Sequence, residues 1–200
     1  MRRRVLCSFI VVAMLFILCA MCACNGNGGG SQPALKEGMT LQELHDFFET
    51  VTNFTYDYDN LEDGYSDEVL TERWTEKGRT QVGMSDATTR FESWLFCEDN
   101  RYYGLLKVTN TKTGEVTCSS EVKNMTKEEF DRYGSVKQLL AAFYSDCEDE
   151  NVEWHIENGK LIIKDTVWHL TYTVYNFNTT KWVELPEEFK NYKDLPLTEE

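Results

Sequence analysis

The sequence predicts an α+β domain in which a strongly curved antiparallel sheet, an incomplete barrel, is covered by two helices. Three observations lead to this prediction. Two Thr-x-x-Glu capping boxes introduce apolar residues at helical spacing. Many short segments alternate between apolar and polar residues and are joined by tight turns, which favours antiparallel pairing. The chain also carries 11 Phe, 10 Tyr and 5 Trp, enough apolar surface to build a buried core.

The first predicted helix follows a capping box in which Thr40 caps the helix and Glu43 bonds back to it. Apolar residues then recur every three or four positions, as on one face of a helix. These residues are Leu41, Leu44, Phe47, Phe48 and Val51. We expect the helix to end near Asn53.

Alternating residues predict a series of strands after this helix. The first is 54–58, and a turn-rich stretch follows it over 59–67. We expect hairpins of 69–76 with 79–84, turning at Lys77 and Gly78, and of 91–98 with 101–109, turning at Asp99 and Asn100. A turn over 112–114 leads to another strand, 116–122.

The second predicted helix begins at the capping box of Thr126 and Glu129 and includes Phe130 and Tyr133. Gly134 and Ser135 interrupt this helix. Ser135 with Gln138 can cap a continuation through Val136, Leu139, Leu140, Phe143 and Tyr144.

Four more strands are predicted after the second helix. Strands 152–157 and 160–164 flank Asn158-Gly159, the strongest hairpin turn in the sequence. Strands 167–177 and 181–185 complete the sheet. Pro186 and Pro196 then indicate a tail without regular structure.

The first 23 residues have the layout of a secretory signal. Arginines at 2–4 precede an uncharged apolar run over 5–21, and small residues lead to Cys24. Ala23 suits the position before a cleavage site, and the Gly-rich stretch 25–33 is typical of a flexible linker. A retained membrane helix and an ordinary secretory signal are the alternatives.

The segment Met-Cys-Ala-Cys at 21–24 resembles the lipobox of bacterial lipoproteins. It departs from the usual pattern at Met21, where Leu is common, and at Cys22. The resemblance implies a lipid on Cys24, with Cys22 or Cys19 as alternatives, and an exported protein anchored to the outer face of the cell membrane. Buried lipid methylenes would hold it there at roughly 0.8 kcal/mol each. The expected organisation is a signal peptide over 1–23, the lipidated cysteine and linker over 24–38, and one domain over 39–200.

Two stretches resemble the lipoprotein-carrier fold of the LolA and LppX type. Residues 44–58, LHDFFETVTNFTYDY, look like its opening helix and first strand, and 172–189, YTVYNFNTTKWVELPEEF, like its closing strands. The resemblance is architectural, covers most of 40–190 and carries no catalytic motif. It implies an incomplete antiparallel barrel that wraps around helices, opens into an apolar cavity and binds an apolar ligand such as lipid.

The net charge of −14 argues against nucleic acid as a partner, because an acidic chain is repelled by phosphate backbones. Removing the leader arginines makes the chain still more negative. Anionic lipid headgroups repel it too, so membrane contact is expected through the anchor rather than through a basic face.

Three cysteines remain in the predicted domain: Cys97, Cys118 and Cys147. Their spacing contains no Cys-x-x-Cys, which gives a zinc site little support. Cys97 and Cys118 lie on predicted strands and could pair, while a buried free thiol is the alternative. The odd number leaves at least one thiol unpaired.

No pattern in the chain predicts an enzyme, a cofactor or a metal. The chain has no nucleophile-elbow, metalloprotease or phosphate-loop motif. His155 and His169 lie on separate predicted strands and could face one another, but ordinary sheet residues are the favoured interpretation; His45 lies in the first helix. The acidic run 146–150 lacks the ligand spacing of a calcium loop.

All five tryptophans fall on predicted strands, and core packing explains most such residues. Some could instead line a concave apolar pocket, for which the candidates are Trp94, Trp154, Trp168 and Tyr172. The sequence therefore predicts a non-enzymatic, membrane-anchored lipoprotein that binds an apolar ligand. The alternative is an envelope module for protein–protein interaction without a small-molecule ligand.

Overall fold

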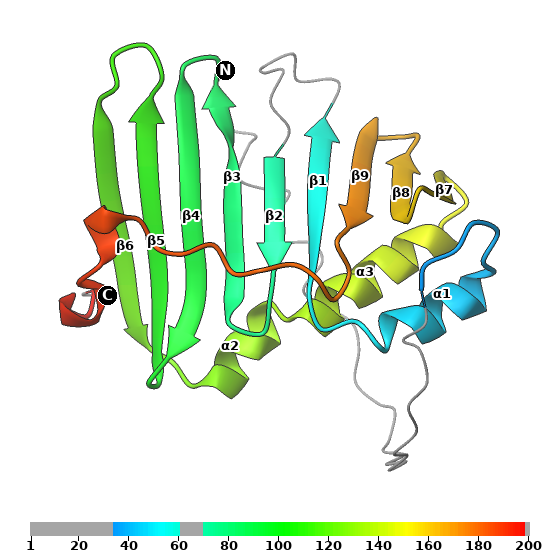
Figure 1. Cartoon of the computed structure of the whole chain (residues 1–200), viewed down its shortest axis with the longest axis horizontal. Helices are drawn as coiled ribbons and strands as arrows, with labels where there is room; N and C mark the ends of the chain where they lie inside the picture. Colours follow the sequence, from blue (N-terminus) through cyan, green and yellow to red (C-terminus); the bar gives the residue numbers. More distant parts are fainter. Residues whose placement is uncertain (1–33, 61–69, 199–200) are drawn as a thin grey trace. The chain divides into compact units, whose positions relative to one another are not determined.

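Within the described residues, nine strands form one antiparallel sheet whose two edges are not joined (Figure 1). The computed structural model describes residues 34–60 and 70–198. The order across the sheet is β6-β5-β4-β3-β2-β1-β9-β8-β7, so the last three strands return to pair with the first. The predicted α+β class and the antiparallel sheet are confirmed.

Along the described residues one helix is followed by six strands, two helices and three strands. The strands are β1 (Phe54–Asn60), β2 (Leu70–Trp74), β3 (Gly78–Asp86), β4 (Thr89–Glu98), β5 (Arg101–Asn110), β6 (Val116–Asn124), β7 (Val152–Glu157), β8 (Lys160–Asp165) and β9 (Leu170–Tyr175). The helices are α1 (Leu41–Phe48), α2 (Lys127–Tyr133) and α3 (Val136–Glu148), and two short 3₁₀ turns, Glu187–Phe189 and Tyr192–Asp194, lie in the C-terminal segment.

The predicted capping boxes all form. Thr40 caps α1 with Glu43, Thr126 caps α2 with Glu129, and Ser135 caps α3 with Gln138. The predicted interruption at Gly134 and Ser135 is confirmed, but it separates α2 from α3, so the described residues form three helices where two were expected. Gly134 ends α2, and Ser135 has an extended backbone and supplies a new cap, so one helix cannot run through both positions.

The predicted hairpins also form, and their turn residues show why. Asp99 and Asn100 have φ of 53° and 56°, and Asn158 and Gly159 have φ of 51° and 72°. Positive φ at both central residues matches the right-handed twist of the flanking strands, and Asn, Asp and Gly adopt it most readily. Local turn chemistry therefore sets these strand connections.

Two predicted strands differ in the structure. The strand predicted over 167–177 is limited to Leu170–Tyr175, and the strand predicted over 181–185 does not form. Asn176 and Asn178 have positive φ and turn the chain out of β9. The following segment then crosses β2 to β6 instead of lying along a strand (Figure 1), so its backbone cannot join a ladder.

Side chains of directly paired residues share one face of a sheet, so the strand register defines two faces. One face carries Phe54 and Trp74, which are paired across β1 and β2, and we call it the helix face. The opposite face carries Trp94 and Leu105, paired across β4 and β5, and we call it the tail face. Each face has its own buried cluster.

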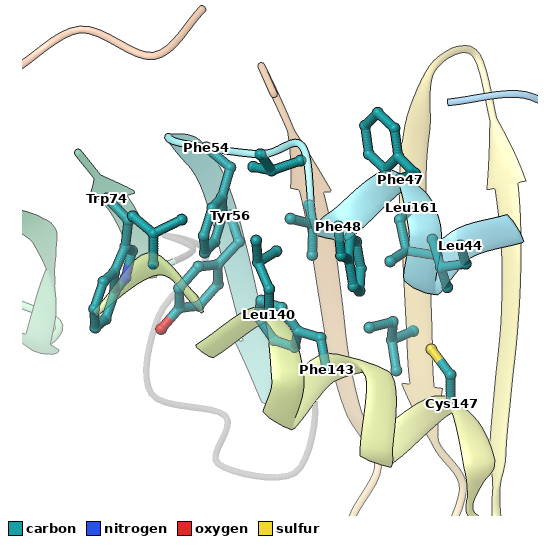
Figure 2. Close-up of a cluster of buried hydrophobic side chains, with 14 of the residues drawn as sticks. Leu44, Phe47, Phe48, Phe54, Tyr56, Trp74, Leu140, Phe143, Cys147 and Leu161 are labelled. Atoms are coloured by element: carbon teal, nitrogen blue, oxygen red, sulfur yellow. The ribbon is translucent and has the colours of Figure 1, made fainter. Parts of the chain in front are cut away.

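On the helix face, side chains from α1 and α3 pack with those of β1, β2, β7, β8 and β9 in one core cluster (Figure 2). Leu44, Phe54 and Leu161 are fully buried in it. Phe143 of α3 lies edge-on to Phe54, with ring centroids 6.1 Å apart. Leu35 and Met39 also pack against the cluster, so at Leu35 the packing extends into the range 24–38 that was predicted as linker.

On the tail face, the C-terminal segment packs on β4, β5 and β6. Phe189 is buried against Trp94, with ring centroids 5.9 Å apart, and the Trp94 Nε1 donates to the Val183 carbonyl at 3.2 Å. We call these residues the tail cluster: Trp94, Phe96, Tyr103, Leu105, Val122 and Phe189, with Trp182, Leu185, Tyr192 and Leu195 around them. The sheet thus buries opposite faces in its two halves.

Candidate functional site

A pocket of about 300 Å³ lies on the helix face across β3 to β6, beside α2. We call it the α2 pocket. Four strands, the β6–α2 connection and the α2 region contribute its lining residues: Arg79, Leu95, Tyr102, Glu121, Lys123, Met125, Phe130 and Gly134. The register explains how they meet, because Arg79 pairs with Leu95, Leu95 with Gly104 and Gly104 with Glu121.

The N-cap of α2 sets the position of Phe130, the side chain that this helix contributes to the pocket. Thr126 fixes where the helix starts, directly after β6, and Phe130 is buried one turn later. Because α2 is only seven residues long, it brings Phe130 toward the pocket without extending across the sheet. Lys127 lies over the Phe130 ring, 5.1 Å from its centroid.

Tyr102 and Gly104 shape the strand surface in the pocket. A Cβ on Gly104 would lie 2.9 Å from the Tyr102 hydroxyl oxygen, so the tyrosine side chain occupies space that only a glycine leaves open. The Tyr102 and Phe130 ring centroids are 6.2 Å apart. Burial raises the pKa of Tyr102, and the protonated hydroxyl can donate a hydrogen bond.

Charged side chains complete the pocket lining. Lys123 Nζ lies 2.7 Å from a Glu121 carboxylate oxygen, and both side chains are about half exposed. The Arg79 guanidinium lies over the Trp74 ring, 5.4 Å from its centroid. Two cations and one carboxylate therefore line a pocket whose other surfaces are mainly aliphatic and aromatic.

A buried polar network adjoins the α2 pocket through Arg79 and Trp74. The carboxyl group of Glu72, which is 3% exposed, accepts hydrogen bonds from Trp74 Nε1 at 2.9 Å and from Gln81 Nε2. The Ser93 hydroxyl donates a hydrogen bond to the Gln81 amide oxygen, Oε1, at 3.0 Å. Buried carboxyl groups are costly unless satisfied in this way, so the network holds β2, β3 and β4 in one arrangement.

The predicted pocket residues are not brought together. Trp94 is buried in the tail cluster, on the opposite face from Tyr172. Tyr172 and Trp154 pack against the core cluster on the helix face. Trp168 lies in the β8–β9 turn and is 69% exposed, although it was expected on a strand. None of these four residues lines the α2 pocket. Its lining contains no tryptophan, so the tryptophan pattern could not indicate it.

One sequence signal does mark the pocket. Gly104 interrupts an aromatic and aliphatic strand between Tyr103 and Leu105. A glycine inside a strand often marks the close approach of another group, which here is the Tyr102 side chain. Arg79, Leu95 and Phe130 have no comparable signal, since each lies on a different element.

The three described cysteines are free thiols in different surroundings. Cys97 lies on the helix face and donates to the Met125 carbonyl at 3.1 Å, whereas Cys118 is exposed on the tail face, so the proposed pairing of these two does not form. Cys147 is buried in the core cluster, where burial and then Asp146 raise the pKa of its thiol to about 12. Cys24 lies outside the described residues.

The described residues contain no group of three or more His, Cys, Asp and Glu side chains placed to hold a metal ion. His155 is exposed on β7, and His169 lies in the β8–β9 turn rather than on a strand. His45 packs edge-on to Tyr144. In the same part of the chain, no helix is both long enough and apolar enough to cross a bilayer.

Comparisons of the chain with protein-family models, with curated proteins and with solved structures give no match. The α2 pocket and its surroundings must therefore be interpreted from their own chemistry.

Proposed function

We propose that this protein is a lipid-anchored, non-enzymatic binding protein of the cell envelope that holds a small ligand in the α2 pocket. The observation that carries this proposal is the pocket itself, which joins an apolar surface to two cationic side chains and one carboxylate, a net positive lining. The ligand that fits has an apolar body and an anionic group, as a short acyl chain with a carboxylate or phosphate does.

The size and lining of the pocket support this class of ligand. A volume of about 300 Å³ is at the lower end for small-molecule sites, which favours a compact ligand or one end of a longer one. Leu95, Met125 and Phe130 offer apolar contact. Arg79 would pair with the anionic group, and an arginine can do so with two hydrogen bonds.

The proposal moves the ligand away from the space between helices and sheet that a LolA-like cavity would use. There, fully buried side chains of the core cluster occupy the space, including Leu44, Phe54 and Leu161. We propose that the sheet curves strongly around α1 and α3 as an incomplete barrel. The packing of both helices with β1, β8 and β9 in one cluster supports this arrangement.

Fluorescence titration with 1-anilinonaphthalene-8-sulfonate, an anionic aromatic probe, tests the pocket in the full-length protein purified from membranes. The Arg79→Gln variant should bind the probe about tenfold more weakly, because a charge-assisted hydrogen bond contributes about 1.5–3 kcal/mol. Arg90→Gln is the matched control, since Arg90 lies on the tail face of β4. Equal binding by both variants, with unchanged melting temperatures, would contradict the proposal.

The anchor has a separate test. Cys24→Ala should release the protein from membranes into the medium or periplasm, whereas Cys22→Ala should leave it attached. Release by the second variant instead would move the lipid to the other cysteine. Retention of both variants would favour an uncleaved membrane helix.

The exposed β8–β9 turn favours the interaction module as a second candidate. Asp165 accepts hydrogen bonds from the backbone nitrogens of Val167 and Trp168, each at 2.8 Å, and so holds the turn in shape. Val167 is 56% exposed and Trp168 69%. A photo-crosslinking residue at position 168 should then give one crosslinked product of defined mass in cells, and the same residue at exposed position 153 should not.

A further inference from the structure

Strand β6 forms one edge of the sheet. On its outer side, the backbone of Val122 is already hydrogen-bonded to Thr198. Val122 N donates to Thr198 Oγ1 at 2.9 Å, and the Val122 carbonyl accepts from Thr198 N at 2.8 Å. The backbone groups of Val122 therefore point away from β5. Because the direction of these groups alternates along an antiparallel strand, Ser120, Cys118 and Val116 point outward as well.

The outward run from Val116 to Ser120 lacks the usual protection of an edge strand. Natural edges carry charged residues, prolines or bulges that prevent pairing with another chain. Residues 116–120 read Val-Thr-Cys-Ser-Ser, and all five are exposed. Within the described part of the chain, the outward backbone groups of Val116, Cys118 and Ser120 have no hydrogen-bond partner. This stretch can accept another strand.

Charge indicates which strand would pair there. Residues 110–124 contain Lys112, Lys123, Glu115 and Glu121, so this region is neutral in a chain with a net charge of −14. A basic partner would be drawn to the acidic surfaces elsewhere. A second copy of this acidic chain is repelled least at a neutral region, which makes it the partner that β6 fits best.

We propose that two copies of this protein pair along β6 in antiparallel register, with Cys118 at the two-fold axis. Cys118 then lies opposite Cys118 of the second copy, and Val116 opposite Ser120 of the second copy. This register uses the three unpaired outward residues and leaves Thr198 on Val122. Such an interface is isologous and closes at two copies.

The ends of the paired run fit this register. The position opposite Val122 would be Gly114 of the second copy, where φ is 74° and the chain turns out of the strand direction. The paired run therefore stops before Val122, where Thr198 of the same copy already bonds to the strand edge. Glu115 would lie opposite Glu121 of the second copy, and the Lys123 ammonium, 2.7 Å from Glu121, offsets that repulsion.

Oxidative crosslinking of the full-length protein, purified from membranes in detergent, tests the register. The Cα atoms of a hydrogen-bonded antiparallel pair are about 5.5 Å apart, within disulfide range. Added diamide would take two electrons and two protons from the Cys118 thiols of two copies, forming the disulfide and a hydrazine. A dimer that is reversed by dithiothreitol should form in the wild type and not in Cys118→Ser.

A shifted cysteine provides the matched control. In the double variant Cys118→Ser and Thr117→Cys the new thiol is also exposed, but it lies opposite residue 119 of the second copy. It should crosslink at least about tenfold more slowly than wild type, because the two thiols are out of disulfide range. Equal rates would show random collision and overturn the proposal.

Sedimentation of the same preparation tests pairing without the thiols. Ser120→Pro removes an outward N–H that β5 does not use, so the sheet should stay folded while the dimer dissociates at least about tenfold more readily. Ser120→Ala keeps the N–H and should remain dimeric. A wild type that is monomeric at all concentrations overturns the proposal, whatever the α2 pocket binds.

Discussion

The indole nitrogen of Trp74 donates a hydrogen bond to the carboxyl group of Glu72, two residues earlier on β2, at 2.9 Å. Both side chains are buried on the helix face, and the Arg79 guanidinium lies over the same indole ring. This contact joins the buried polar network to the α2 pocket.

The Glu72 network should be important for stability. Glu72→Ala leaves Trp74 Nε1 and Gln81 Nε2 without their acceptor, which we expect to lower the free energy of unfolding by about 2–4 kcal/mol. Urea denaturation measures this change. Glu76→Ala, at an exposed position, is the control and should change stability by less than about 0.5 kcal/mol. Similar losses in both variants would contradict this role.

Neighbouring residues of β8 should differ sharply on truncation. Leu161 is fully buried in the core cluster, and Leu161→Ala should cost about 2–5 kcal/mol through lost contacts and a residual cavity. Ile162 is half-buried on the tail face, so Ile162→Ala should cost less than half as much. Urea denaturation of the two variants measures this difference. Coinciding midpoints would contradict the assignment of Leu161 and Ile162 to opposite faces.

The C-terminal segment should stabilise β4 to β6 although it adds no strand. Phe189→Ala removes the aromatic side chain packed on Trp94 and should cost about 3 kcal/mol, with a red shift in tryptophan fluorescence. Leu197→Ala, at a residue 44% exposed, should leave both readings nearly unchanged. A stable Phe189→Ala variant would indicate that the segment is only loosely attached.

The charge of Glu129 should make the α2 cap sensitive to pH. Hydrogen bonds from the Thr126 backbone and then its hydroxyl hold the pKa of Glu129 below its usual value. A lowered pKa stabilises the fold above the ordinary glutamate value of about 4.3, and this contribution is lost as the pH falls through the lowered pKa. Glu129→Gln should therefore be less stable than wild type at pH 7 and equally stable in acid.

Urea midpoints at several pH values measure this convergence. Glu150→Gln, at an exposed turn, should show no comparable change between neutral and acid pH. A difference for Glu129→Gln that persists in acid would mean that the carboxylate charge is not the cause.

Local features were predictable because they depend on residues a few positions apart. Thr126 and Glu129 are three residues apart, and their capping box follows from side-chain chemistry alone. The Asn158-Gly159 turn is equally local. The break between α2 and α3 was predictable for the same reason, because Gly134 and the Ser135 cap are adjacent in the sequence.

The candidate site was less predictable. Trp94 lies on a strand as predicted, but it is buried under the C-terminal segment, whereas Trp168 lies in an exposed turn. Alternation identifies which residues of one strand share a face and cannot relate the faces of distant strands. The α2 pocket depends on that relation, since Arg79, Tyr102 and Phe130 come from three separate elements.

The sequence by itself determined the class of the domain, its helix caps and its hairpin turns, because each is decided by contacts within about four residues. Only the tertiary structure decided that the two halves of the sheet bury opposite faces. That outcome rests on contacts between distant segments, such as Trp94 Nε1 with the Val183 carbonyl, 89 positions away. It also decided that the segment predicted as a last strand crosses the sheet, because Trp182, Leu185 and Phe189 pack in or against the apolar cluster on the tail face.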